Sequence, residues 1–171
     1  MYERNSYKRI IGVDVGGVIT DILKNDGTDT SFLSDNYLQT TAVPDAFESL
    51  KILNSDYAYF KDLVRIVSKA GPEIEQKTRN WFKHNGFYDI TGISPEHVYF
   101  CRERKDKAPI CERLGITHFV DDNIEVMSHL RNIVPNKYLF CSQANESELG
   151  KYSDLSFVHV GSWKEVLELV K

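Results

Sequence analysis

Residues 10–18 have the sequence IIGVDVGGV. This apolar, β-branched run stops at Asp14 and continues into two glycines, which predicts a buried strand followed directly by a turn. A carboxylate at the tip of a buried strand costs free energy unless it has partners. Asp14 is therefore either a residue that caps a turn or a functional carboxylate, acting as a nucleophile or a metal ligand.

Similar short apolar runs recur along the chain and alternate with amphipathic segments. We expect strands at residues 9–13, 63–67, 97–101, 116–120, 138–141 and 157–160. We expect helices at residues 44–53, 72–83, 108–114, 123–132 and 162–170. Strands that alternate with helices predict an α/β fold, a three-layer, Rossmann-like arrangement in which helices flank a central parallel sheet.

Composition narrows the class of protein further. The chain has 171 residues and a net charge of −4, which predicts one domain over residues 1–171 and gives no electrostatic footprint for nucleic acid or for an anionic membrane. No apolar run approaches the roughly 18 residues that a membrane span needs. The three cysteines show no C-x-x-C spacing, so we expect a reducing, cytoplasmic location.

Polar residues follow three of the predicted strands, and ligands bind at the carboxyl ends of the strands in parallel sheets. Ser68 and Lys69 follow the second strand, where a hydroxyl and backbone N–H groups suit a phosphate oxygen, although a serine there is also a common helix cap. Lys107 precedes the helix at 108–114. A cation is unfavourable at a helix N-terminus, so it either has an anionic partner or is a solvated member of the charged run 102–107.

Asp121 and Asp122 end the predicted strand at 116–120. Two adjacent carboxylates repel each other, and a divalent cation such as Mg²⁺, which prefers oxygen ligands, relieves that repulsion. Capping of the following helix accounts for one of them but not for both. With Asp14, Ser68 and Lys107 they make up a phosphoryl-transfer site: a carboxylate to attack phosphorus, cations to neutralise its oxygens and a hydroxyl to position them.

The order of these residues resembles the haloacid dehalogenase (HAD) superfamily. Asp14 is similar to motif I, Ser68 to motif II, Lys107 to motif III and the pair Asp121 and Asp122 to motif IV. The resemblance implies a HAD-like fold without a large cap domain. It also implies a Mg²⁺-dependent phosphohydrolase, a phosphomonoesterase that forms an aspartyl-phosphate on Asp14.

The resemblance also implies a role for each site residue. The catalytic residues would be Asp14, Ser68 and Lys107. The substrate phosphate would contact Gly16, Gly17, Ser68, Lys69 and Lys107. The Mg²⁺ ligands would be Asp14, Gly16 through its carbonyl, Asp121 and Asp122. Lys105 is the alternative motif III lysine, although Lys107, with a proline two residues later, fits that motif better. The expected partner is a phosphorylated substrate, small or large, and an oligomer is compatible with the sequence.

Gly16 departs from the family pattern. Phosphatases of this family usually have an aspartate there as general acid and base, a contribution typically worth about 10²- to 10⁴-fold in rate. Its replacement is expected to slow departure of the leaving group and hydrolysis of the intermediate. Residues 20–43 are expected to form a flap whose hairpin turns at residues 25–27, where the sequence is Asn-Asp-Gly.

Two other functions compete with the phosphatase. The missing acid at Gly16 favours a weak or inactive HAD-like domain that binds phosphorylated partners. The stretch GVDVGG is also similar to the phosphate-binding segment of actin-like sugar kinases. That fold needs two related domains and leaves Asp121 and Asp122 unexplained.

Overall fold

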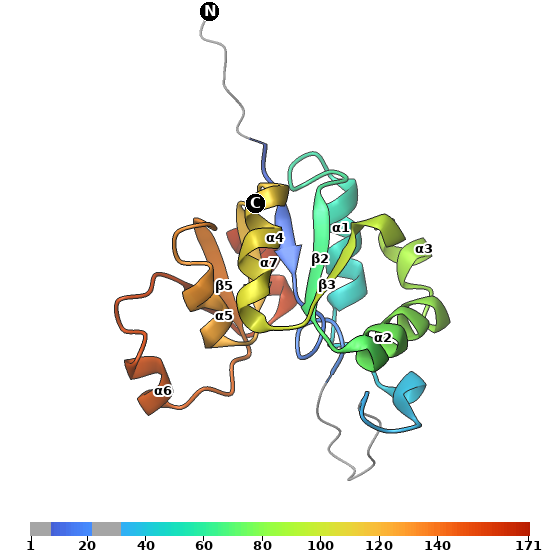
Figure 1. The fold of residues 1–171 in the computed structure, drawn as a ribbon. Helices are drawn as coiled ribbons and strands as arrows, with labels where there is room; N and C mark the ends of the chain where they lie inside the picture. Colours follow the sequence, from blue (N-terminus) through green and yellow to red (C-terminus); the bar gives the residue numbers. More distant parts are fainter. Residues whose placement is uncertain (1–7, 22–31) are drawn as a thin grey trace, which may run out of the picture.

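The computed structural model describes residues 8–21 and 32–171, and its centre is a parallel sheet. The six strands are β1 (Ile11–Val13), β2 (Val64–Lys69), β3 (Val98–Cys101), β4 (His118–Asp121), β5 (Asn136–Phe140) and β6 (Val158–Val160). They lie in the order β3-β2-β1-β4-β5-β6, and every pair is parallel. The predicted α/β fold with a central parallel sheet is confirmed (Figure 1).

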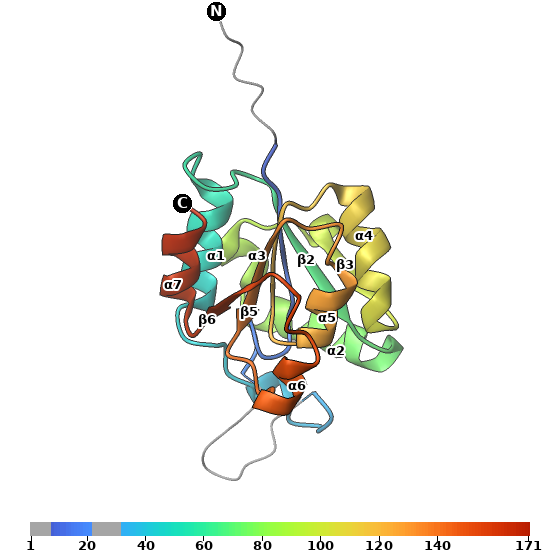
Figure 2. The ribbon, with the colours of Figure 1, turned by 90° about the vertical axis from the view of Figure 1, so that its left-hand side faces the viewer.

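Helices cover both faces of this sheet. They are α1 (Ala46–Ser55), α2 (Pro72–His84), α3 (Phe87–Thr91), α4 (Lys107–Leu114), α5 (Ile124–His129), α6 (Glu146–Gly150) and α7 (Trp163–Leu169). Three short 3₁₀ turns lie between them, η1 (Tyr37–Gln39), η2 (Pro95–His97) and η3 (Arg104–Asp106). Figure 2 shows α1 and α7 on one side of the strands and α4 and α5 on the other. No helix among residues 8–21 and 32–171 is long and apolar enough to cross a membrane.

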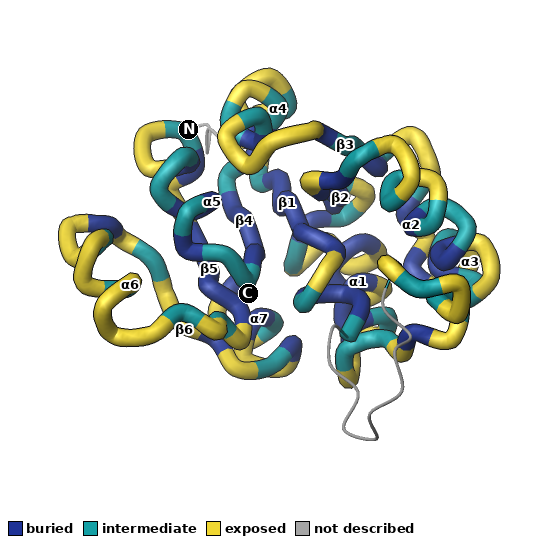
Figure 3. The backbone as a smooth tube through the Cα atoms, turned by 60° about the horizontal axis from the view of Figure 1, so that its bottom comes forward, coloured by how far each residue is buried: buried dark blue, intermediate teal, exposed yellow. Residues whose placement is uncertain are grey.

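The alternation of strand side chains produces two apolar cores. Val13 and Ile66 point to the core under α1, α3 and α7, whereas Phe119 and Leu139 point to the core under α4 and α5. The two central strands, β1 and β4, are buried along their whole length (Figure 3). Gly12 is required in β1, because a Cβ atom there would lie 2.5 Å from the Phe119 ring.

The strand order determines where polar residues gather. The chain runs from β1 outward to β2 and β3 and then returns to β4 on the other side of β1, so the order reverses between β1 and β4. Ligands bind in the crevice at such a reversal. Val13 lies opposite Val120, and the Asp14 N–H donates to the Val120 carbonyl at 3.0 Å. The register therefore places Asp14 beside Asp121.

The two described ends of the segment 20–43 lie side by side and run in opposite directions. Thr20 forms an antiparallel bridge with Ala42, and the Asp21 N–H donates to the Thr41 carbonyl at 2.8 Å. The predicted turn at residues 25–27 lies outside the described residues.

Candidate active site

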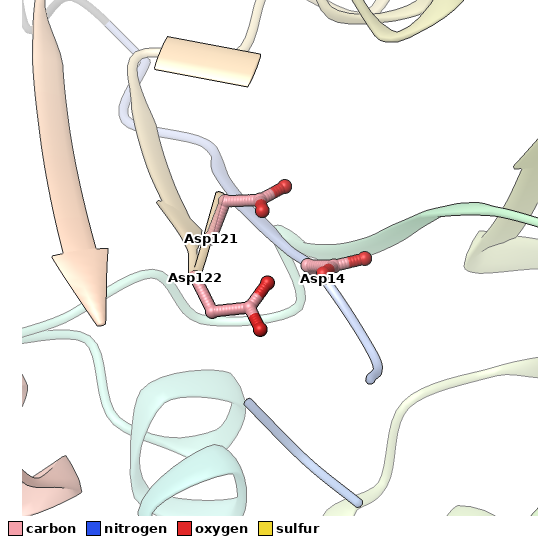
Figure 4. A group of neighbouring side chains, drawn as sticks. All are labelled: Asp14, Asp121 and Asp122. Carbon is pink, nitrogen blue, oxygen red and sulfur yellow. The ribbon is translucent and has the colours of Figure 1, made fainter. Parts of the chain in front are cut away.

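Three carboxylates meet at the carboxyl ends of β1 and β4. One oxygen from each of Asp14, Asp121 and Asp122 lies within 4.8 Å of the others, and their side chains project into the same space (Figure 4). Asp14 and Asp121 are buried, and Asp122 is half-buried. Asp121 is held in place because its Oδ1 accepts a hydrogen bond from the Asn123 N–H at 3.0 Å. The arrangement offers several oxygen ligands to one cation.

Lys107 is the ammonium partner of this cluster. Its side chain is 2% exposed, and its Nζ lies 2.9 Å from Asp14 Oδ1 and 2.7 Å from Asp121 Oδ2. Burial disfavours the ammonium, but the carboxylates of Asp121 and Asp14 outweigh that effect and raise the pKa of Lys107, so it stays charged. Lys105 is exposed and pairs with Glu103 at 3.1 Å instead. Of the two candidate lysines, Lys107 is the one that reaches the carboxylates.

One ammonium is too little charge for three carboxylates. Burial is the largest cause that raises the pKa of Asp121, with the Asp14 carboxylate second. Burial, then Asp14 and Asp121, likewise raise the pKa of Asp122. The negative charge is thus incompletely compensated, and the donors are hard oxygens at close range. Mg²⁺ fits this donor set.

The two glycines after β1 differ in what surrounds them. Gly17 has a φ of +78°, and a Cβ atom there would lie 2.3 Å from Asp122 Oδ2. Only glycine therefore allows the turn to pass under the Asp122 carboxylate. Gly16 has nothing within 4 Å of the place where its Cβ would be. The backbone imposes no need for glycine at this position.

Ser68 and Lys69, at the end of β2, face the carboxylates across a cavity of about 230 Å³, which we name the phosphoryl cavity. Its lining residues are Asp14, Gly16, Ser68, Lys69, Arg104, Lys107, Asp121, Asp122, Asn123 and Val126. Every predicted site residue lies here except Gly17. The structure places Gly17 on a neighbouring cavity, because its backbone turns beneath Asp122.

Three residues of the phosphoryl cavity were not expected from the sequence. Arg104 belongs to the charged run 102–107, and its Nη1 lies 3.0 Å from Glu125 Oε2, so its place at the cavity depends on α5. Nothing in its spacing singled it out. Asn123 directly follows the aspartate pair and caps α5, because its Oδ1 accepts a hydrogen bond from the Glu125 N–H at 3.0 Å. An asparagine directly before a helix is a common N-cap, so the sequence could have pointed to this residue. Val126 adds an apolar wall.

Comparison with known proteins identifies the fold. No protein-family model and no curated protein sequence matches this chain. A crystal structure of a dehalogenase with an intermediate complex superposes with a TM-score of 0.65 at 17% identity, covering 95% of this chain and 97% of that one. The D,D-heptose 1,7-bisphosphate phosphatase from Burkholderia thailandensis superposes with a TM-score of 0.57 at 13% identity, covering 96% and 99%. The chain therefore has a HAD-like fold, a Rossmann-like parallel sheet with helices on both faces.

Proposed function

We propose that the protein is a Mg²⁺-dependent phosphomonoesterase that forms an aspartyl-phosphate on Asp14. The observation that carries this proposal is the pairing of Asp14 with the buried Lys107 at 2.9 Å, beside two further carboxylates within 4.8 Å. An ionised carboxylate held next to a fixed ammonium is suited to attack phosphorus. One of the structural neighbours is described as a phosphatase and another as a dehalogenase with an intermediate complex.

The charges of the phosphoryl cavity support a phosphate ligand. Of its cationic side chains, Lys107 contacts the carboxylates, Arg104 is paired with Glu125, and Lys69 also lines the cavity. Mg²⁺ held by Asp14, Asp121, Asp122 and the Gly16 carbonyl would add two positive charges and neutralise charge on the phosphoryl oxygens. The cavity would then carry the excess positive charge that complements a phosphate dianion.

Each of the residues around the cavity has a separate role in the proposed reaction. Asp14 attacks phosphorus, the bond from phosphorus to the ester oxygen breaks, and water then hydrolyses the aspartyl-phosphate. Lys107 and the Ser68 hydroxyl hold the phosphoryl oxygens in line with Asp14. Gly16 itself supplies no acid to protonate the leaving oxygen, so in this proposal the step depends on the leaving group.

Hydrolysis of 4-nitrophenyl phosphate tests the proposal. The wild type is expected to turn over only with Mg²⁺, and Asp14→Asn is expected to lose about 10³-fold or more. Asp89→Asn, on the exposed surface of α3, is the matched control and is expected to keep wild-type turnover. Undiminished turnover in Asp14→Asn would overturn the nucleophile. Binding of Mg²⁺ and phosphate by the wild type with no turnover would favour the alternative suggested by Gly16, a domain that binds phosphorylated partners.

A further inference from the structure

A second cavity, of about 150 Å³, adjoins the phosphoryl cavity and shares Gly16, Ser68 and Lys69 with it. Its exposed surface is mainly apolar, and Phe32 and Ile74 contribute to it, while Thr20, Asp21, Thr40 and Thr78 are polar members of the lining. We propose that this aryl cavity holds the ring of an aryl phosphate, so that aryl phosphomonoesters are the substrate class. This inference rests on the proposed function and deepens it.

One wall of the aryl cavity is fixed by aromatic contacts. The Phe32 ring lies edge-on to Tyr37 at a centroid distance of 5.9 Å and 6.2 Å from the ring of Trp81. Trp81 is in turn anchored, because its Nε1 donates to the Thr40 carbonyl at 2.9 Å. The Phe32 carbonyl accepts from Lys77 Nζ at 3.0 Å. A wall held at ring and backbone needs little ordering when a ligand binds.

The other wall is a face of α2. Ile74 and Thr78 are four residues apart and therefore lie on the same side of the helix. The Thr78 hydroxyl donates to the Ile74 carbonyl at 2.7 Å, so its hydrogen is used within the helix. This wall presents little that would hold a polar group by hydrogen bonding, which favours an apolar occupant.

The size of the cavity suits a single ring. An engineered apolar cavity of about 150 Å³ in another protein binds benzene. The two cavities share the lining residues Gly16, Ser68 and Lys69 and are therefore adjacent, so one molecule would place its phosphoryl group in one and its ester substituent in the other. Gly16 lines both cavities and carries no side chain that would narrow the space there.

The chemistry at Gly16 selects the same class independently. A phenol ionises near pH 10, far more readily than an aliphatic alcohol, so a phenolate leaves without a general acid. Asp14 forms a bond to phosphorus, the bond from phosphorus to the phenolic oxygen breaks, and the electron pair leaves with the phenolate, which takes a proton from solvent water. A second water then attacks phosphorus and releases Asp14 and inorganic phosphate, and its proton passes to solvent. The steps need no further reactant.

Kinetic specificity gives the first test. We compare kcat/KM for phenyl phosphate with kcat/KM for ethyl phosphate, in the presence of Mg²⁺. Ile74→Trp, which fills the aryl cavity, is expected to lower this ratio about tenfold, because the ring loses its apolar contacts. Phe32→Ala removes the opposite wall and is expected to lower it too. Ile52→Trp, on the exposed side of α1, is the matched control and keeps the ratio. A ratio unchanged in both cavity variants would overturn the inference.

Binding separates this inference from the proposed function. Phenylphosphonate is expected to bind about tenfold more tightly than methylphosphonate in calorimetry with Mg²⁺, and Ile74→Trp should abolish that preference. A preference without any hydrolysis would support the cavity and overturn the phosphatase. Asp14-dependent hydrolysis without a preference would overturn the cavity alone. A phosphotyrosine peptide, tested beside free phenyl phosphate, shows whether the ring is accepted as part of a protein or only as a small molecule.

Discussion

Strands β1 and β4 have polar groups gathered at both of their ends. At the amino end, Thr117 Oγ1 accepts from the Ile10 N–H at 2.9 Å, donates to the Ile10 carbonyl at 3.0 Å and lies 2.8 Å from His118 Nδ1. At the carboxyl end, Lys107 contacts Asp14 and Asp121 and leaves the cluster with excess negative charge. The first set of groups satisfies itself, whereas the second has more negative than positive charge.

This difference separates structural from functional polar groups. Buried groups that satisfy one another stabilise the fold and have no need of a ligand. Buried like charges that remain under-compensated persist at the expense of stability, which is typical of sites that bind or react. Substitution of single side chains at either end of β1 and β4 tests this contrast.

The largest effect is expected from Lys107→Met. Removing the ammonium leaves the buried Asp14 and Asp121 without their counter-charge, which typically costs 3–5 kcal/mol. Urea unfolding at pH 7 without Mg²⁺ measures the loss. Lys105→Met, two residues away and exposed, serves as control and should unfold at the wild-type urea concentration. A Lys107→Met protein as stable as the wild type would mean that the carboxylates are not ionised together.

His118→Phe probes the amino end through pH. Burial, helped by Arg9, lowers the pKa of His118 to about 4, below its ordinary value of 6.5. Between pH 6.5 and pH 4 the unfolded chain therefore binds a proton at His118 that the folded protein does not bind. The contribution of His118 to the free energy of unfolding is complete above pH 6.5 and is lost as the pH falls towards 4.

We expect the wild type to lose about 2 kcal/mol more than His118→Phe between pH 7 and pH 5. Phenylalanine retains the ring contacts with Phe60 and Tyr138, so any constant offset is separate from the pH slope. Parallel pH profiles for the two proteins in urea unfolding would show that His118 titrates normally.

Gly16→Asp is expected to improve the reaction at the carboxyl end. The position has room for a side chain, and an added acid there would protonate the leaving oxygen. We expect kcat/KM to rise about tenfold on ethyl phosphate and less on 4-nitrophenyl phosphate, whose leaving group needs no proton. Gly16→Asn tests whether the acid or the bulk matters. A folded Gly16→Asp protein with no gain on either ester would show that the acid does not reach the leaving oxygen.

The smallest effect is expected from Thr117→Val. The Ile10 N–H loses its side-chain acceptor at a half-buried position, which should lower the free energy of unfolding by about 1 kcal/mol. Because this end is remote from the phosphoryl cavity, Mg²⁺-dependent turnover should stay at the wild-type level. Thr41→Val, on the exposed surface, controls for the substitution. Lost turnover in a stable Thr117→Val protein would break the distinction between the two ends.

The sequence predicted the parts of the molecule that depend on local pattern. All six strands follow from apolar runs, and Asp14, Ser68 and Asp121 were identifiable because each stands where such a run ends. The strand order that joins them was not readable, because it depends on pairings between distant segments. The five-residue helices α3 and α6 are too short to show a helical period.

The aryl cavity was missed for the same reason. Phe32 and Ile74 are 42 positions apart, and neither carries a recognisable chemical pattern. They become neighbours of Gly16 only when α2 packs beneath the returning segment that holds Phe32. Arg104 likewise reaches the phosphoryl cavity through its contact with Glu125 on α5. Sequence patterns identify residues that react more readily than residues that shape the space around them.

The contrast between Gly16 and Gly17 has an evolutionary consequence. Glycine and aspartate codons can differ by a single nucleotide, and at position 16 the fold opposes nothing that such a change would introduce. At position 17 the same mutation would strike the Asp122 carboxylate. Of the two adjacent glycines, position 16 accepts a side chain and position 17 does not, so one point mutation would place a carboxyl group at position 16 without any repacking.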